Sequence, residues 1–383
     1  MNIALTLAII LIATTLAGHL CVRLGQPAVI GQMLVGIVLG PTILNWVPLT
    51  PTLTAFADIG VVVLMFLAGL ETDTRGLRRY LMPSVAVAVL GILLPVGVTY
   101  LLARTWQLSV LTSLFTGIVF SATSVSISVA VLRELGVLRG RAGSIILGAA
   151  VLDDVAAVIL TGVFMGMAGG KSTNMGVQLL WQVAFVFGTW AVVVWLAPTL
   201  MRLAEKLLIP FGRELTALAL CLLMAGVAEV VGLSAALGAF FAGIAISQTA
   251  VRETVSRSVD VIGTGIFVPV FFVSIGLHLH LSLHTNWWFV LALTALAVVS
   301  KWLGAGLGAK LTGSSWHESS VIGAGMISRG EMALIVALIG ERAGLLPGNE
   351  YDVIIAAIIL ATLIAPFILR WQVKTERSVP GRS

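Results

Sequence analysis

Long apolar runs alternate with short polar turns along almost the whole chain. The runs start near residues 2, 28, 52, 82, 109, 144, 176, 214, 234, 259, 286, 319 and 351. A helix of roughly 20 apolar residues crosses the hydrocarbon core of a bilayer, and a helix satisfies its own backbone hydrogen bonds there. The pattern therefore predicts an all-α polytopic membrane protein with about 13 transmembrane helices, one for each run.

The two halves of the chain resemble each other at a constant spacing. IGQMLVGIVLG from Ile30 is similar to LGAFFAGIAIS from Leu237, at an offset of 207 residues. MFLAGL from Met65 is similar to FVSIGL from Phe272 at the same offset. Because the offset contains an odd number of predicted helices, we expect two inverted-topology repeats, as in many secondary transporters. The expected organisation is a single membrane domain over 1–383. It contains a first repeat at 1–170, a linker helix at 171–212, a second repeat at 213–372 and a cytoplasmic tail at 373–383.

The fifth predicted helix is interrupted by hydroxyl side chains. Its centre reads SATSVSIS from Ser121, and such residues compete with the helix for backbone hydrogen bonds. Ser121, Thr123 and Ser124 can serve either as ion ligands or as packing contacts between membrane helices. The segment predicts the first of two discontinuous crossing helices.

The twelfth predicted helix, the repeat partner of the fifth, contains Arg329 and Glu331. Two positions apart, they would point about 200° away from each other on a continuous helix. Unwinding with Gly330 as the pivot would let both face the protein interior, where we expect a charge-compensated structural pair. The half-helix ends and free carbonyls of two such breaks attract small cations.

Charge is scarce and unevenly placed. Charged residues make up 10% of the chain and hydrophobic residues 59%, with a mean hydropathy of +1.09; a soluble globule has about one quarter charged residues. Seventeen basic residues fall on one side of the predicted helices and three on the other, which places the N-terminus outside and the C-terminus in the cytoplasm. The basic residues form no patch for nucleic acid, and no sequence pattern calls for a cofactor.

Two adjacent carboxylates, Asp153 and Asp154, lie inside the apolar run 144–166. A charged side chain at the bilayer centre raises the free energy of membrane insertion by on the order of 2.5 to 3.5 kcal/mol. Two adjacent charges therefore indicate a functional site. Lys301 lies too deep in the eleventh run to reach an interface and needs an acid, which can be Asp153, Asp154 or Glu331. If Lys301 pairs with Asp153, then Asp154, about 100° around the helix, faces a water-filled cavity.

Oxygen ligands suit a hard cation such as Na⁺ better than a transition metal, which would favour a cluster of Cys and His. Asp153 and Asp154 are therefore the candidate ligands for Na⁺ and for protons. Protonation and cation binding at these carboxylates should compete.

The residues described above, taken with several longer motifs, resemble the monovalent cation:proton antiporter-2 family, and more narrowly the bacterial electrogenic Na⁺/H⁺ antiporters with an Asp-Asp motif. The motifs, which span essentially the whole chain, are QPAVIGQMLVGIVLGP, VLMFLAGLETD, ATSVSISVAVLRELG, ILGAAVLDDV, VVSKWLGAGLGAKL and ISRGEMALIV. The resemblance implies a homodimer in the inner cell membrane, in which a six-helix core moves like an elevator against a scaffold. It also implies that the protein is a transporter and no enzyme.

Carried over by motif, Asp154 is the principal carboxylate for the ion and the proton, Asp153 is its partner, and Lys301 is the paired lysine. The residues that line or stabilise the crossing are Thr123, Ser124, Arg329 and Glu331. K⁺/H⁺ exchange by the same architecture is an alternative. Lys301 argues against a Na⁺-coupled solute symporter. The adjacency of Asp153 and Asp154 argues against an intramembrane aspartyl protease, which needs its two acids on separate helices.

Overall fold

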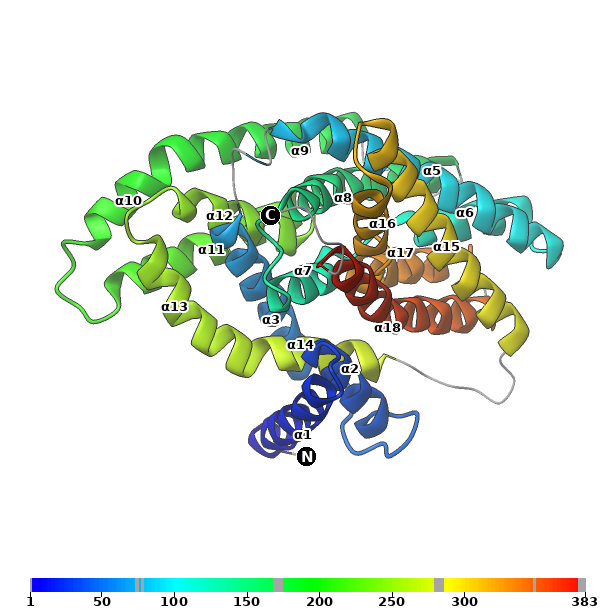
Figure 1. The fold of residues 1–383 in the computed structure, drawn as a ribbon, viewed down its shortest axis with the longest axis horizontal. Helices are drawn as coiled ribbons and strands as arrows, with labels where there is room; N and C mark the ends of the chain where they lie inside the picture. The colour runs from blue at the N-terminus through cyan, green and yellow to red at the C-terminus, as the bar shows by residue number, and fades with distance from the viewer. Residues whose placement is uncertain are drawn as a thin grey trace. The chain divides into compact units, whose positions relative to one another are not determined.

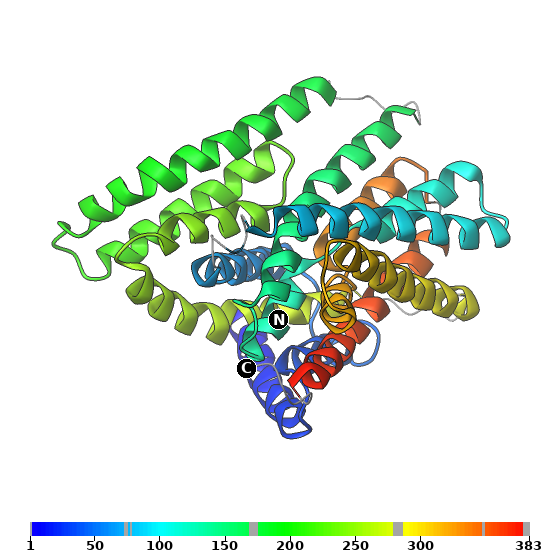
Figure 2. The same ribbon diagram turned by 45° about the horizontal axis from the view of Figure 1, so that its top comes forward.

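The computed structural model describes residues 2–72, 76, 79–167, 175–278, 286–346 and 349–377. In these ranges every regular element is a helix, and no strand occurs. Figure 1 and Figure 2 show the helices from two directions. The prediction of an all-α protein is confirmed.

The helices fall into two compact units. The first comprises Met1–Leu49, Arg75–Lys171 and Phe272–Ser383, and the second comprises Thr50–Thr74 and Ser172–Phe271. The first unit holds α1 (Ile3–Arg23), α2 (Ala28–Leu39), α5 (Leu81–Thr105), α6 (Val110–Ser121), α7 (Val125–Glu134), α8 (Arg141–Met167), α15 (Trp287–Leu311), α16 (Trp316–Gly325), α17 (Gly330–Arg342) and α18 (Asn349–Arg377).

The second unit holds α3 (Pro51–Glu71), α9 (Met175–Ala191), the π-helical turn η1 (Val192–Leu196), α10 (Ala197–Ala204), α11 (Gly212–Val230), α12 (Ala235–Ser247), α13 (Arg252–Ile262) and the π-helical turn η2 (Gly263–Phe267). The boundary between the units falls inside α14 (Val268–Leu277). Each unit takes helices from both halves of the chain, so the units are not the predicted repeats, and the predicted domain boundaries remain a prediction.

Twelve of the 13 predicted starts lie within three residues of the start of a helix. The exception is α13, which was expected near residue 259 and begins at Arg252. Its first turns, RETVSRSVD, are polar and bury only Val255 and Val259. So few apolar positions predict a loop. The two buried valines are four residues apart and therefore lie on one face of the helix.

Nine helices in the described ranges are long and apolar enough to span a membrane, and three shorter apolar helices accompany them. Two of the short ones are α2 and α12, with 12 and 13 residues. Thirteen spans are therefore not confirmed by helix length, and that count remains a prediction.

The core of the first unit lies where α6, α8, α15, α17 and α18 meet. It buries Phe115 and Phe120 of α6 together with apolar residues of the other four helices. Beside it, α5 and α15 pack along each other (Figure 1, Figure 2). This packing fixes the centres of α8 and α15 against the two interrupted helices.

Close glycine contacts join helix pairs in both units, and two of these contacts correspond to each other. In the first unit a Cβ at Gly31 of α2 would overlap the backbone of Ala17 on α1. In the second, a Cβ at Gly238 of α12 would overlap the backbone of Met224 on α11. The second contact is the first one shifted by 207 residues at both partners, which is the offset of the predicted repeat.

Candidate functional site

The first helix break lies between α6 and α7. Ala122 and Ser124 have extended backbones, with ψ of 137° and 113°, so the helix stops after Ser121 and restarts at Val125. The Ser121 hydroxyl donates a hydrogen bond to the carbonyl of Ile118, at 2.7 Å. Ser121, Thr123 and Ser124 are at most 2% exposed, so the backbone groups freed by the break need partners inside the protein.

The second break lies between α16 and α17, over residues 326–329. Gly330 has φ of +54°, a left-handed conformation, and a Cβ there would collide with the Ser124 hydroxyl. Only glycine meets both conditions at low cost. The prediction that Gly330 is the pivot of an unwound segment is confirmed.

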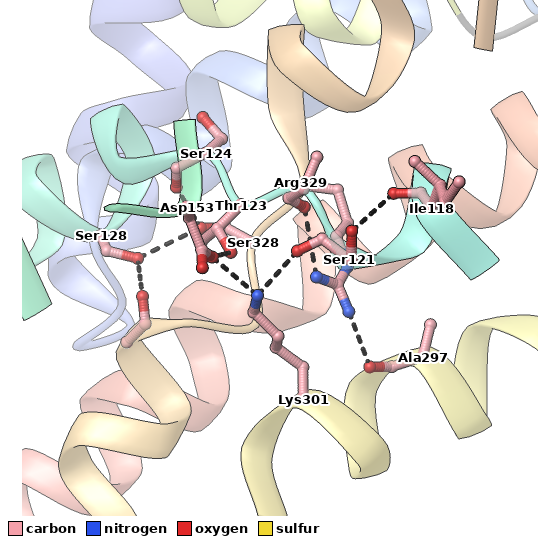
Figure 3. Close-up of polar contacts among 12 residues, drawn as sticks. Ile118, Ser121, Thr123, Ser124, Ser128, Asp153, Ala297, Lys301, Ser328 and Arg329 are labelled. Atoms are coloured by element: carbon pink, nitrogen blue, oxygen red, sulfur yellow. Dashed lines mark hydrogen bonds and ion pairs between the residues drawn. The ribbon is translucent and has the colours of Figure 1, made fainter. Parts of the chain in front are cut away.

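The two breaks hydrogen-bond to each other, as Figure 3 shows. The backbone N–H of Ser124 donates to the carbonyl of Ser328 at 2.9 Å, and the Ser328 hydroxyl donates to the carbonyl of Ser124 at 2.5 Å. The Ser128 hydroxyl donates to the carbonyl of Gly325 at 2.5 Å and lies 3.1 Å from the Ser328 hydroxyl. Each break thus supplies partners for the backbone of the other.

Sequence reasoning missed Ser128 and Ser328 as members of the site. Ser128 belongs to the SATSVSIS segment that predicted the first break, and Ser328 directly precedes Arg329. The available signal was the concentration of hydroxyls in both interrupted segments, but it does not say which hydroxyls meet.

A buried ion pair lies beside the first break. The Lys301 ammonium on α15 is 2.8 Å from Oδ2 of Asp153 on α8, and both side chains have no exposed surface. Lys301 also donates to the carbonyl of Ser121 at 2.7 Å, and the Thr123 hydroxyl donates to the same Oδ2 at 2.5 Å (Figure 3). Of the three acids that could have paired with Lys301, the structure selects Asp153.

The other oxygen of that carboxylate has different surroundings. Oδ1 of Asp153 is buried and accepts no hydrogen bond from any described residue. A buried carboxylate oxygen without a donor is costly unless a proton or a cation reaches it. Asp153 therefore has one oxygen neutralised by Lys301 and one that can take a cation or a proton.

Asp154 follows on the same helix and differs in exposure. Asp153 is 1% exposed, whereas Asp154 is partly exposed. The two side chains leave α8 about 100° apart. The arrangement expected from the sequence, with one acid paired in the interior and its neighbour more accessible, is present in the geometry.

Arg329 is fully buried and lies between the first break and α15. Its Nη1 donates to the carbonyl of Ala122 at 3.2 Å and its Nη2 to the carbonyl of Ala297 at 3.0 Å (Figure 3). Its observed partners are thus carbonyls freed by, or close to, the crossing. Glu331 is the second residue of α17, but its side chain lies outside the described part of the structure, so the predicted pair with Arg329 stays a prediction.

The chemistry of the site is that of hard oxygen donors. No group of three or more His, Cys, Asp or Glu side chains that could hold a metal ion occurs in the described ranges. Carboxylates, hydroxyls and carbonyls are present instead, and their oxygens are the ligands that alkali cations bind. Asp153 is paired with Lys301 in the interior, so a cation that binds here adds a full positive charge to the site unless a proton leaves it.

Comparison with known proteins places the whole chain among membrane transporters. The family described as sodium/hydrogen exchanger, transmembrane, matches residues 7–375. The chain is 43% identical to a Na⁺/H⁺ antiporter of Enterococcus hirae over 372 residues, which cover 96% of this chain and 97% of the relative. It is 42% identical to the Na⁺/H⁺-K⁺ antiporter GerN of Bacillus cereus, with 95% of each chain covered. The sodium proton antiporter MjNhaP1 of Methanocaldococcus jannaschii has the same fold, with a TM-score of 0.71 over 100% of both chains at 16% identity.

Proposed function

Because the chain belongs to the transmembrane sodium/hydrogen exchanger family, and is a cation/proton antiporter on that basis, we propose that it exchanges Na⁺ or Li⁺ for protons electrogenically at the crossing of its two broken helices. Asp154 is the principal ligand of the cation and the proton, and Asp153 is its partner. The observation that carries the proposal is the buried Asp153–Lys301 pair, which lies at the hydrogen-bonded crossing and next to Asp154.

Exchange follows from competition for the same carboxylate oxygens. A Na⁺ ion that approaches Asp154 and the open oxygen of Asp153 displaces the proton held by Asp154 and repels the Lys301 ammonium, which releases a second proton. Protons arriving on the other side of the membrane displace the cation and restore the Asp153–Lys301 pair. Thr123 and Ser124 line the crossing, while Arg329 and Glu331 stabilise it.

The same groups account for charge movement. One cation exchanged against two protons transfers one net charge per cycle, and a unit charge crossing a potential of 100 mV changes the free energy by about 2.3 kcal/mol. In proteoliposomes with a potassium gradient clamped by valinomycin, Na⁺-driven proton movement should respond to the imposed potential. Rates that are the same at every potential would reject electrogenic exchange.

The decisive variant is Asp154→Asn, with Asp260→Asn as the matched control. Asp260 is on α13 of the second unit, where it accepts a hydrogen bond from Thr264 at 2.7 Å. In proteoliposomes, cation-induced ΔpH should disappear in Asp154→Asn and persist in Asp260→Asn. Retained exchange in Asp154→Asn would remove the ion-binding role of that carboxylate.

A second cation is a specific alternative, because one similar protein is named a Na⁺/H⁺-K⁺ antiporter. Oxygen ligands alone do not fix the size of the ion. The same ΔpH measurement with Na⁺, Li⁺ and K⁺ separates the two versions, since K⁺/H⁺ exchange requires a K⁺ response at least as large as the Na⁺ response.

An inverted internal repeat is part of the proposal. It is supported by contacts that recur at a shift of 207 residues, as at Gly31 and Gly238. A further pair supports it: Gly36 meets Gly276 in the first unit, and Gly69 meets Gly243 in the second. The shift converts one contact into the other with its two partners exchanged, as a two-fold relation between repeats requires.

The remaining elements of the proposal follow from the family and from the basic residues. We place the protein in the inner cell membrane as a homodimer, with the N-terminus outside and the C-terminus in the cytoplasm. Alternating access is elevator-like, with a core built from both repeats carrying the ion. Accessibility of single cysteines to a membrane-impermeant reagent, introduced at either terminus, tests the orientation.

A further inference from the structure

Three candidate spans of the first unit have an end beside one group of basic and aromatic side chains. The helix α5 begins directly after Tyr80, α8 begins at Arg141, and α15 ends at Leu311. The helix α16 starts nearby and packs on α8 and α15. The group therefore lies where the chain leaves the apolar layer, at the ends of the helices whose centres carry Asp153 and Lys301.

Arg141 is at the centre of this group. Its guanidinium lies 5.3 Å from the centre of the Tyr80 ring, and the guanidinium of Arg79 lies 5.7 Å from the same ring. Arg141 also forms an ion pair with Glu318, with Nε 3.4 Å from Oε1. The Arg141 side chain is still 38% exposed, so part of the guanidinium remains available to a ligand.

Lys310 continues the group toward α16. Its ammonium lies 5.0 Å from the centre of the Trp316 ring and donates to the carbonyl of Ser314 at 3.2 Å. The hydroxyl of Ser314 is 3.5 Å from Nη2 of Arg141. Arg79, Tyr80, Arg141, Lys310 and Trp316 thus form one connected set, which we call the basic–aromatic cluster.

The cluster has an excess of positive charge. It contains three cations. Glu318, whose side chain is 14% exposed, contacts the cluster through its ion pair with Arg141. Cations stacked on aromatic faces are held in place without losing their charge. Pre-positioned arginine and lysine groups of this kind suit the oxygens of a phosphate.

Large apolar side chains border the cluster and are open to the outside. Leu81 is 56% exposed, Met82 76%, Leu311 76% and Trp316 71%. A soluble phosphate ion would use only the cations, whereas a phospholipid uses both the cations and the apolar border. Tryptophan and tyrosine at the same level are typical of the headgroup region.

We propose that the basic–aromatic cluster binds an anionic phospholipid. Arg79, Arg141 and Lys310 hold the headgroup phosphate, and the acyl chains lie against the apolar border. Under the proposed orientation this lipid belongs to the cytoplasmic leaflet. The site does not depend on the roles assigned to Asp153 and Asp154, so its test is separate from the test of ion exchange.

Native mass spectrometry of the purified full-length protein can test the site with phosphatidylglycerol and with phosphatidylcholine of the same chain length. Wild-type protein should retain phosphatidylglycerol more tightly. Lys310→Gln should weaken that binding about fivefold, the equivalent of about 1 kcal/mol for one basic residue near a membrane surface, and leave phosphatidylcholine unchanged. Lys310→Arg, which keeps the charge, should bind like the wild type.

Arg257→Gln is the matched control. Arg257 is an 81% exposed cation on α13, 3.4 Å from Glu253 and outside the cluster, so its loss should leave phosphatidylglycerol binding unchanged. Equal retention of the two lipids by the wild type, undiminished binding in Lys310→Gln, or an equal loss in Arg257→Gln would overturn the proposal. Glycerol 3-phosphate should not compete, and full competition would reduce the cluster to a site for soluble phosphate.

Discussion

The Asp153–Lys301 pair allows a quantitative test of how the buried charges depend on each other. Lys301→Met removes the ammonium but keeps the length of the side chain, and leaves a buried carboxylate that still accepts from Thr123. Asp153→Asn removes the negative charge and leaves a buried ammonium that still donates to the carbonyl of Ser121. Each single change leaves a charge without its partner in a fully buried place.

Breaking a buried ion pair from one side costs about 3 to 5 kcal/mol, whereas replacing both partners is often close to neutral. Each single variant should therefore lower the apparent unfolding temperature strongly. On the scale of a few degrees per kcal/mol for large domains, the loss is roughly 6 to 20 °C. The double variant should be at least as stable as the better of the two singles, which corresponds to a coupling energy of several kcal/mol.

Thermal unfolding of purified protein in detergent, followed by intrinsic tryptophan fluorescence, measures all four members of this cycle. The matched control is the same cycle on the exposed pair of Arg257 and Glu253, whose side chains are 81% and 83% exposed. Exposed pairs contribute little, so that cycle should show small effects and little coupling. Additive losses at Asp153 and Lys301 would refute the view that the two charges stabilise each other.

Two further predictions concern the crossing itself. Gly330→Ala places a methyl group in a left-handed conformation and against the Ser124 hydroxyl, so it should nearly abolish cation-induced ΔpH in proteoliposomes. The control is Gly344→Ala, where φ is +71° and the space around the glycine is open. This variant should keep exchange and lose only about 1 to 2 kcal/mol of stability. An equal loss of exchange in both variants would contradict the role of the contact between Gly330 and Ser124. Ser128→Ala removes the hydrogen bond to the Gly325 carbonyl and should lower the stability by about 1 to 3 kcal/mol. The loss should be measured as a lower unfolding temperature. An unchanged temperature would argue against a stabilising role of this hydrogen bond.

The positions of the helices and of their breaks follow from local sequence. Apolar runs of sufficient length predict spans because the helix satisfies its own backbone, and the starts of α5, α6 and α15 lie within one residue of the predicted ones. The breaks could be predicted because hydroxyls in SATSVSIS and the glycine at 330 act on the backbone nearest to them. The polar start of α13 was missed because its few apolar residues do not mark it as a helix.

Which side chains meet was decided by tertiary packing. The sequence supplied three acids for Lys301, and the choice of Asp153 depends on the rotation of α8 against α15, partners that lie 148 residues apart in the chain. The bonds of Arg329 to two carbonyls, and of Ser128 and Ser328 to the opposite break, depend in the same way on how the interrupted helices cross. Sequence by itself thus determined which groups are charged, buried and able to break a helix, because these are local properties. Only the tertiary structure decided their partners, because a hydrogen bond or an ion pair between distant segments requires positions fixed to within a fraction of an ångström.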